Sequence, residues 1–162
     1  MIKEGEMGIA ITLKEYMENH GLAYEVIDHR RTDSALTSSE AAHVPGDRMA
    51  KSVLLGDDAS YLLAVIPATY RVQLDEIARL TGRRFSLITE DELEEAFSDC
   101  EIGAIPPIGV PYGIETLVDS RLMLQPDICC ESGDHGKLLH LSADAFRAAE
   151  EEAVVAEIGR HL

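Results

Sequence analysis

The segment from Gly103 to Gly113 holds half of the chain's six prolines and a quarter of its twelve glycines within eleven positions. It reads Gly-Ala-Ile-Pro-Pro-Ile-Gly-Val-Pro-Tyr-Gly. Proline fixes φ and removes a backbone donor, whereas glycine permits positive φ and close backbone approach, so neither a helix nor a central strand can run through this segment. We therefore expect a stiff, shaped loop at this point of the chain.

Such a loop has two interpretations. Because it is stiff, it can hold backbone NH groups in fixed positions, and fixed donors stabilise a developing oxyanion without reorganising during a reaction. Alternatively, the segment is a tight connection between strands, since glycine and proline punctuate loops of every kind. Taken alone, the eleven residues favour the simple connection.

The length and composition predict one globular domain. A chain of 162 residues buries roughly 70% of the surface that its unfolded form exposes. Apolar residues make up 46% and charged residues 27%, as in an average soluble protein. The first residues are acidic and no run of about 18 apolar residues occurs, so we expect a single cytosolic domain over residues 1–162, without a membrane partner.

The net charge of −16 is unevenly distributed. Residues 1–84 carry 10 Lys and Arg against 13 Asp and Glu, and residues 85–162 carry 4 against 17. This balance argues against a general nucleic-acid binder and against DNA as a partner, because phosphate would be repelled at long range. A local phosphate site remains compatible, since charges are screened over about 8 Å at physiological salt. Seven basic residues of the first half would form such a face if they cluster: Arg30, Arg31, Arg48, Lys51, Arg71, Arg83 and Arg84.

The cysteines and aromatic residues exclude other kinds of site. Cys100 and the adjacent Cys129 and Cys130 have neither the spacing of a zinc site nor an even count, which favours reduced structural thiols. With no Trp and only eight Phe plus Tyr, the chain has little material for a base-stacking platform. The sequence predicts no metal and no cofactor.

Capping and stop signals predict five helices. Thr12-Leu-Lys-Glu15 and Thr37-Ser-Ser-Glu40 are capping-box patterns, in which a hydroxyl and a carboxylate satisfy free NH groups at a helix start. Gly21 and Gly82 supply stop signals. The predicted helices cover residues 13–20, 37–44, 73–80 and 89–97 and a segment capped by Ser142.

Apolar and alternating runs predict the strands. They lie at residues 23–28, 52–55, 61–66, 85–88, 115–118, 128–131 and 138–141. The runs 52–55 and 61–66, joined by Gly56-Asp-Asp-Ala-Ser60, form the clearest hairpin. Because helices and strands are intermixed without regular βαβ alternation, we expect a mixed α/β (α+β) domain with a central mixed sheet or partial barrel flanked by helices, and not a Rossmann fold.

Two ionisable residues stand out as site candidates. Lys51 begins a core strand, where desolvation lowers a lysine's pKa unless an anion pairs with it. His135 lies in the turn Gly133-Asp-His-Gly136, from which an imidazole can reach a pocket. Each also has a simpler interpretation: the lysine can extend its amine to solvent from a strand end, and the histidine can be solvated.

Five segments of the chain form an ordered set: Met49-Ala-Lys-Ser-Val-Leu-Leu55, Leu63-Ala-Val-Ile-Pro67, Arg71-Val-Gln-Leu-Asp75, Asp99-Cys-Glu-Ile-Gly-Ala-Ile-Pro-Pro107 and Gly133-Asp-His135. In order and spacing, this set resembles the YbaK family of prolyl-tRNA-synthetase-like editing domains. The resemblance extends over about residues 12–147, and the ordered set is more specific than any one segment. The resemblance implies a YbaK-like fold and a hydrolase, an aminoacyl-tRNA deacylase that cleaves the ester of mischarged tRNA, and a chain without synthetase domains is similar to the free, trans-acting form.

The resemblance also implies the roles of individual residues. Lys51 would hold the 3′ end of the aminoacyl-tRNA and His135 would shape the amino-acid pocket, while a ribose hydroxyl of the terminal adenosine helps to activate water. Gly103 to Pro107 correspond to the family's GxxxP loop, whose NH groups could bind the ester carbonyl. The implied catalytic residues are Lys51, Gly103 and His135, and the implied substrate-binding residues are Ser52, Ala104, Ile105, Pro106 and Pro107.

Rival interpretations remain open at this point. The strong acidity is unexpected for a tRNA ligand, so recognition would be confined to the CCA end, or a synthetase or elongation factor would supply the affinity. The protein could instead be a catalytically silent relative that binds a synthetase or small ligand, or an enzyme that forms a Schiff base through Lys51. Glu150 to Glu152 lie beyond the resemblance and are expected on a solvated C-terminal helix face.

Overall fold

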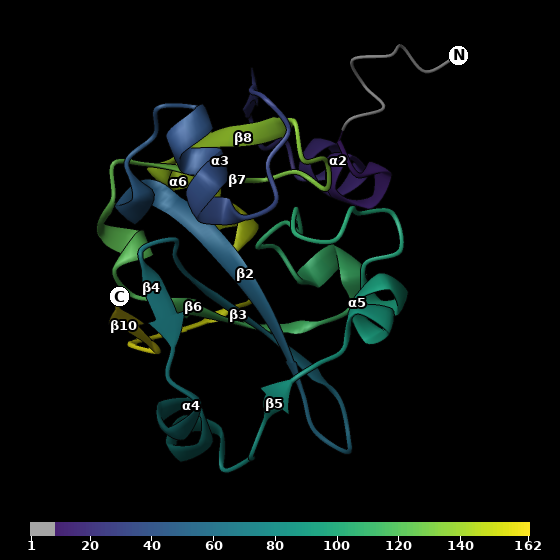
Figure 1. Cartoon of the computed structure of the whole chain (residues 1–162), viewed down its shortest axis with the longest axis vertical. Helices are drawn as coiled ribbons and strands as arrows, with labels where there is room; N and C mark the ends of the chain where they lie inside the picture. Colours follow the sequence, from purple (N-terminus) through teal and green to yellow (C-terminus); the bar gives the residue numbers. More distant parts are fainter. Residues whose placement is uncertain (1–8) are drawn as a thin grey trace.

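A computed structural model describes residues 9–162 of the chain (Figure 1). Eight strands of this part form one sheet in the order β1-β8-β7-β2-β3-β6-β9, with β5 paired to β2, and two form a smaller sheet, β10-β4. The strands are β1 (Glu25–Asp28), β2 (Met49–Gly56), β3 (Tyr61–Pro67), β4 (Tyr70–Val72), β5 (Ser86–Leu87), β6 (Glu115–Asp119), β7 (Asp127–Glu131), β8 (Lys137–Ser142), β9 (Val154–Ala156) and β10 (Gly159–His161).

The sheet combines parallel and antiparallel pairs. The hairpin β2–β3 and the pairs β1–β8, β7–β8 and β2–β5 are antiparallel, whereas β2–β7, β3–β6 and β6–β9 are parallel. The helices are α2 (Ile11–Asn19), α3 (Ala35–Ala41), α4 (Leu74–Thr81), α5 (Glu90–Ala96) and α6 (Ala143–Ala149). The predicted fold class, a mixed sheet flanked by helices, is confirmed.

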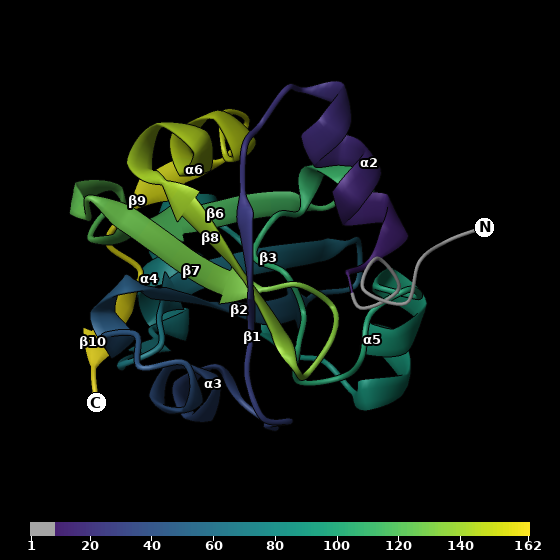
Figure 2. The same ribbon diagram turned by 90° about the horizontal axis from the view of Figure 1, so that it is seen from above.

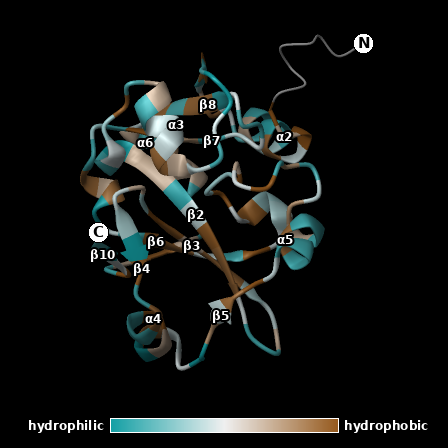
Figure 3. Cartoon of the chain, viewed as in Figure 1, coloured by the Kyte–Doolittle hydropathy of each residue, from teal (hydrophilic) through white to brown (hydrophobic). Residues whose placement is uncertain are grey.

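Side chains that alternate along the strands supply a core on each face of the sheet. On one face, Phe146 of α6 and Met17 of α2 are buried in the largest apolar cluster. On the other, Ala35 of α3 packs in a cluster with Met49 of β2 and Cys129 of β7. Figure 2 accordingly shows α6 and α3 on opposite sides of the sheet. Figure 3 shows that the hydrophobic colour concentrates along the central hairpin, whereas α5 is largely hydrophilic.

One edge of β2 is paired at both ends and open in the middle. β7 pairs with Met49 and Ala50, and β5 pairs with Leu55 and Gly56. Within the described part of the chain, residues 51–54 have no strand partner on this edge. Because alternate residues of a strand direct their NH and C=O groups to the same edge, this gap leaves backbone hydrogen-bonding groups available.

The helix starts differ from the predictions at two positions. Helix α2 begins at Ile11 without a side-chain cap, because the NH of Thr12 is satisfied by Asp99 Oδ2 at 2.8 Å. Helix α3 begins three residues earlier than Thr37 would give, because Ser34 is the N-cap and Thr37 closes its capping box. The other caps are confirmed: Thr89 and Ser142 accept hydrogen bonds at the starts of α5 and α6, and Gly82 ends α4 with a φ of 71°.

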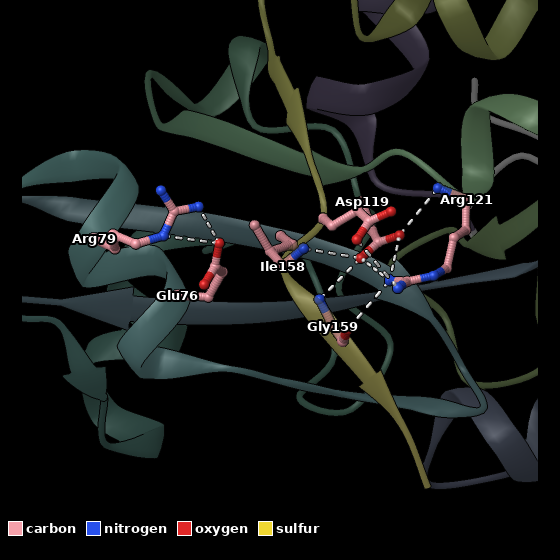
Figure 4. A network of polar contacts seen from close by, with 7 residues as sticks. Glu76, Arg79, Asp119, Arg121, Ile158 and Gly159 are labelled. Carbon is pink, nitrogen blue, oxygen red and sulfur yellow. Dashed lines mark hydrogen bonds and ion pairs between the residues drawn. The ribbon is translucent and has the colours of Figure 1, made fainter.

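The predicted helix at Glu150 to Glu152 was wrong. Helix α6 ends at Ala149, Glu150 is only 3% exposed, and strands β9 and β10 follow, whereas Glu151 and Glu152 are exposed as expected but lie in a turn. Buried Asp119 holds this segment in place, since its Oδ2 accepts hydrogen bonds from the NH groups of Ile158 and Gly159 at 3.0 and 2.9 Å (Figure 4). The acidic run suggested a solvated helix because the remote partners of the strands cannot be recognised from local composition.

No helix within residues 9–162 has the length and apolar character needed to cross a membrane.

Candidate active site

A cavity of about 360 Å³ lies against the open edge of β2. Its lining comes from five parts of the fold: the gap in β2, the start of α3, the segment from β5 to α5, the Gly/Pro loop and the end of β7. The lining residues are Asp33, Ser34, Ala35, Lys51, Ser52, Val53, Leu54, Leu87, Ile88, Leu93, Gly103, Ile105 and Glu131. The interruption of the sheet therefore creates the cavity, and the loop closes one side of it.

Lys51 is half-buried at the start of the gap. Its Nζ donates a hydrogen bond to the carbonyl oxygen of Tyr70 at 2.6 Å. Burial lowers the pKa of the Lys51 amine, and among the described residues no carboxylate lies within ion-pair distance of it. A cation held in this way is available to an anionic ligand that enters the cavity.

The Gly/Pro loop is fixed to two neighbouring elements. Ser52 on β2 donates its hydroxyl to the carbonyl oxygen of Ile105 at 3.0 Å. On the other side, the NH of Gly133 donates to Ala104 O, and the NH of Glu101 donates to Gly133 O, each at 2.8 Å. These bonds tie the loop both to the edge of the cavity and to the turn that contains His135.

Within residues 103–107, two backbone donors remain available. Pro106 and Pro107 have no NH, and the NH of Ala104 donates to Glu101 O at 3.1 Å. The NH groups of Gly103 and Ile105 make no hydrogen bond within residues 9–162, and both residues line the cavity. The arrangement meets the first requirement of an oxyanion site, which is a pair of fixed donors at a ligand-sized cavity.

Gly103 is the residue that the loop geometry requires. Its φ is 88°, and an added Cβ would lie 2.6 Å from Asp33 O and 2.9 Å from His135 Cε1. His135 is 6% exposed and packs against Gly103, and its NH donates to Glu101 Oε1 at 3.0 Å. His135 is thus buried next to the loop and does not line the cavity itself.

The structure brings together part of the predicted site. Four of the predicted site residues line the same cavity: Lys51, Ser52, Gly103 and Ile105. The other three residues of the loop, Ala104, Pro106 and Pro107, are buried and do not line the cavity, so any role they have is in shaping the loop.

Sequence reasoning missed several parts of this cavity. They are the start of α3, the apolar wall from Leu87 to Leu93, and Glu131. A signal for Glu131 exists, because an acidic residue directly follows the apolar run at 128–130 at the end of a predicted core strand.

The basic residues do not form the single face considered from the sequence. Three of them are neutralised by carboxylates, in the pairs Arg31–Glu101 at 2.7 Å, Arg48–Asp127 at 3.2 Å and Arg83–Asp57 at 2.6 Å. Arg71 lies instead on β4 beside Arg160 of β10, a residue from the acidic half of the chain. Any electrostatic attraction for phosphate is therefore local.

Comparisons with known proteins agree with this architecture. The family model of the aminoacyl-tRNA editing domain matches residues 29–149. A proline–tRNA ligase of Geobacillus sp. (strain WCH70) is 23% identical over 149 residues, which cover 82% of this chain but only 26% of the ligase. The chain thus spans about a quarter of that relative.

Solved structures of similar size share the fold. A protein described as a candidate trans-editing enzyme for prolyl-tRNA synthetase superposes with a TM-score of 0.82 at 20% identity, covering 99% of both chains. The hypothetical protein APE2540 superposes with a TM-score of 0.81 at 22% identity, covering 92% of this chain and 99% of its own.

Proposed function

The chain belongs to the aminoacyl-tRNA editing domain family, and we propose that it is a hydrolase that cleaves the ester of mischarged aminoacyl-tRNA. The substrate would be a tRNA that carries a small wrong amino acid, in a system of the prolyl type. The protein would act in trans as a single domain over residues 1–162, in the cytosol where tRNAs are charged.

The observation that carries this proposal is that Gly103 and Ile105, whose NH groups make no hydrogen bond within residues 9–162, line the same cavity as Lys51. Gly103 and Ile105 would donate to the ester carbonyl oxygen as it becomes an oxyanion. Lys51 would bind the anionic 3′ end of the tRNA, and its partly buried amine makes each such contact stronger than at an open surface. His135 would act through its packing against Gly103, by keeping the loop in position.

The chemistry would be a simple hydrolysis. Water attacks the carbonyl carbon, the bond from this carbon to the ribose oxygen breaks, and the ribose oxygen takes a proton, which releases the amino acid and tRNA. A neighbouring ribose hydroxyl of the terminal adenosine would position or activate the water. The protein's contribution would be orientation and oxyanion stabilisation, and losing one oxyanion donor typically costs about 3 kcal/mol of transition-state stabilisation.

The test is a panel of mischarged tRNAs incubated with the wild-type protein and with Lys51→Ala and Lys51→Arg. We expect release of one or a few small amino acids, a loss of at least about 100-fold for Lys51→Ala, and partial retention for Lys51→Arg, which keeps the charge but not the geometry. Absence of release across the whole panel would refute the proposal.

The second candidate is a catalytically silent member of the fold that binds a synthetase or a small ligand. The net charge of −16 favours it, because such a charge repels tRNA at long range but does not oppose the binding of a protein or of an uncharged ligand. A stable complex with a synthetase, no deacylation, and no effect of Lys51→Ala would select this function. Borohydride trapping of a carbonyl compound at Lys51 would instead reveal Schiff-base chemistry.

A further inference from the structure

Glu131 is a buried acidic residue in the wall of the proposed site. It is the last residue of β7, is only 3% exposed and lines the cavity. The parallel pairing of β7 with β2 ends where Cys130 lies opposite Ala50, so Glu131 lies at the point where the open stretch of β2 begins. Among the described residues no ion pair joins Lys51 to this carboxyl, and the Lys51 amine donates instead to Tyr70 O.

The carboxyl of Glu131 is not satisfied by the protein. Neither Oε1 nor Oε2 has a hydrogen-bond partner within residues 9–162. Ser38 lies close enough to the carboxyl to lower its pKa slightly, but no hydrogen bond with good geometry joins the two side chains, and the Ser38 hydroxyl shares a hydrogen bond with Thr32 Oγ1 at 2.5 Å. A buried, unpaired carboxyl is costly, and proteins retain few of them, so one that opens into a cavity calls for a ligand group that can donate hydrogen bonds.

An aminoacyl ester carries such a group next to its reactive carbon. The α-ammonium is attached to the carbon that bears the ester carbonyl, so a site that holds the carbonyl oxygen on one wall also places the ammonium within the same small volume. Gly103 and Ile105 offer donors on the loop wall, and Glu131 offers acceptors at the end of β7. The two walls thus match the two polar ends of an aminoacyl group.

We propose that the Glu131 carboxylate binds the α-ammonium group of the aminoacyl ester and makes the site selective for esters with a free amine. This inference rests on the proposed function. Esters in which the amine is acylated, or replaced by a hydroxyl, leave the carboxyl without its cationic partner and are poor substrates.

The surroundings of Glu131 fit a group that is charged only when a cation is bound. Burial raises the pKa of Glu131 to about 8, against a smaller opposing effect of Ser38. Without a cation nearby, the neutral carboxyl therefore predominates at neutral pH. An ammonium group that enters the cavity favours the carboxylate and forms a charge-assisted hydrogen bond with it.

The first measurement compares two esters that differ in a single group. The tRNA hydrolysed best in the panel is prepared with its amino acid and with the corresponding α-hydroxy acid, and kcat/KM is measured for both. We expect wild-type protein to prefer the amine by at least about tenfold, the effect of one charge-assisted hydrogen bond. Glu131→Gln should bring this ratio close to one, by slowing the amine and not the hydroxyl substrate.

Glu150→Gln is the matched control. Glu150 is equally buried, also has an unpartnered carboxyl oxygen, and does not line the cavity. It should leave the ratio of the two substrates unchanged. A wild-type ratio near one, or an equal loss for both substrates in Glu131→Gln, overturns the inference even where deacylation itself is observed.

A binding measurement separates this inference from the proposed function. The probes are 3′-deoxy-3′-(L-alanylamino)adenosine, which cannot be hydrolysed as an ester, and its L-lactyl counterpart, titrated by NMR or calorimetry. We expect tighter binding of the alanyl probe, by about tenfold or more, and loss of this difference in Glu131→Gln. If no tRNA in the panel is hydrolysed, the proposed function fails. If the two probes bind equally, or if neither binds, the inference about Glu131 fails, whatever the result of the panel.

Discussion

Arg71 and Arg160 stand directly opposite each other in the antiparallel pair β4–β10. Both are exposed, and within the described part of the chain neither has an ion pair. Directly opposed residues point to the same face with their Cβ atoms about 5 Å apart, so like charges there destabilise the pair. Arg71 follows Tyr70, whose carbonyl oxygen accepts a hydrogen bond from Lys51, so the opposed arginines begin one residue along the chain from a contact of the site.

The first prediction is that this pair contacts tRNA phosphate. Arg71→Ala and Arg160→Ala should each weaken tRNA binding and reduce the slope of log Kd against log salt by about 0.7 to 0.9, the effect of one lost phosphate contact. Neither should lower stability, because each relieves a repulsion. Binding titrations at several salt concentrations measure the slope. Arg79→Ala, which removes an arginine already paired with Glu76, is the control, and an equal change in its slope would contradict the assignment.

The second prediction concerns the shape of the loop. Gly103→Ala should reduce deacylation at least about tenfold, because the added Cβ meets Asp33 O and His135 and displaces the NH donors. Gly113→Ala is a matched control, since Gly113 also has positive φ, 71°, but open space around it. Both substitutions carry the roughly 1 to 2 kcal/mol cost of a left-handed residue. Gly113→Ala should lose activity only in proportion to the fraction of protein that is unfolded, whereas Gly103→Ala should also lose activity per folded molecule.

The third prediction is a pH dependence of stability. The pKa of Glu131 is about 8 in the folded protein against an ordinary value of 4.5. Between these values the unfolded state releases the proton that the folded state keeps, so stability falls as pH rises, by at most about 1.4 kcal/mol per unit for this one group. Above pH 8 both states are ionised and the loss is complete.

Urea denaturation at pH 5 and pH 8 tests this dependence. Glu131→Gln should gain stability relative to wild type at pH 8 and little at pH 5. Burial also raises the pKa of Glu150, so Glu150→Gln should act in the same direction. The lowered pKa values of Asp99 and Asp127 affect stability only at more acidic pH. An identical difference from wild type at both pH values would contradict the prediction.

Much of the fold could be predicted from local patterns. The hairpin of β2 and β3 was readable because two apolar runs flank a turn, and α5 and α6 because Thr89 and Ser142 cap them. Strands β9 and β10 were not readable. They are three residues long, and they depend on β6, β4 and Asp119, all remote in the sequence.

The site was predictable to a smaller extent. Lys51 and the Gly/Pro loop stand out because their residue types are unusual for their positions. The cavity itself depends on where β7 stops pairing with β2 and where β5 begins. Register of this kind is set by three-dimensional packing, which is why Glu131 was missed as a site residue even though it was assigned to the predicted strand 128–131.

The fourth prediction concerns the C-terminal anchor. Asp119→Ala should destabilise the protein by about 3 kcal/mol or more, because it leaves the buried NH groups of Ile158 and Gly159 without an acceptor and removes the nearer of the two carboxylates paired with Arg121. Asp144→Ala removes an exposed carboxylate near Arg147 and should cause no measurable change. Thermal or urea denaturation of the two variants compares them directly, and similar midpoints would refute the anchoring role.

The fifth prediction is that the thiols are unreactive in the folded protein. Burial raises the pKa of Cys129 to about 11 and that of Cys100 to about 12. The reactive thiolate is therefore rare at pH 8, and modification by a disulfide reagent should be at least about 100-fold slower in native than in urea-unfolded protein. Rapid native labelling of either residue, followed by mass spectrometry, would be the contrary result.

The open stretch of β2 at residues 51–54 also bears on how such a protein can diversify. The site lies between the short pairings of β2 with β7 and of β2 with β5. Much of its rim is exposed, as at Leu87, which is 70% accessible to solvent. Substitutions at this rim alter few contacts of the buried core. Surface substitutions of this kind usually change the free energy of unfolding by less than about 0.5 kcal/mol. A chain built in this way can acquire a new amino-acid preference while its capacity to fold stays nearly constant.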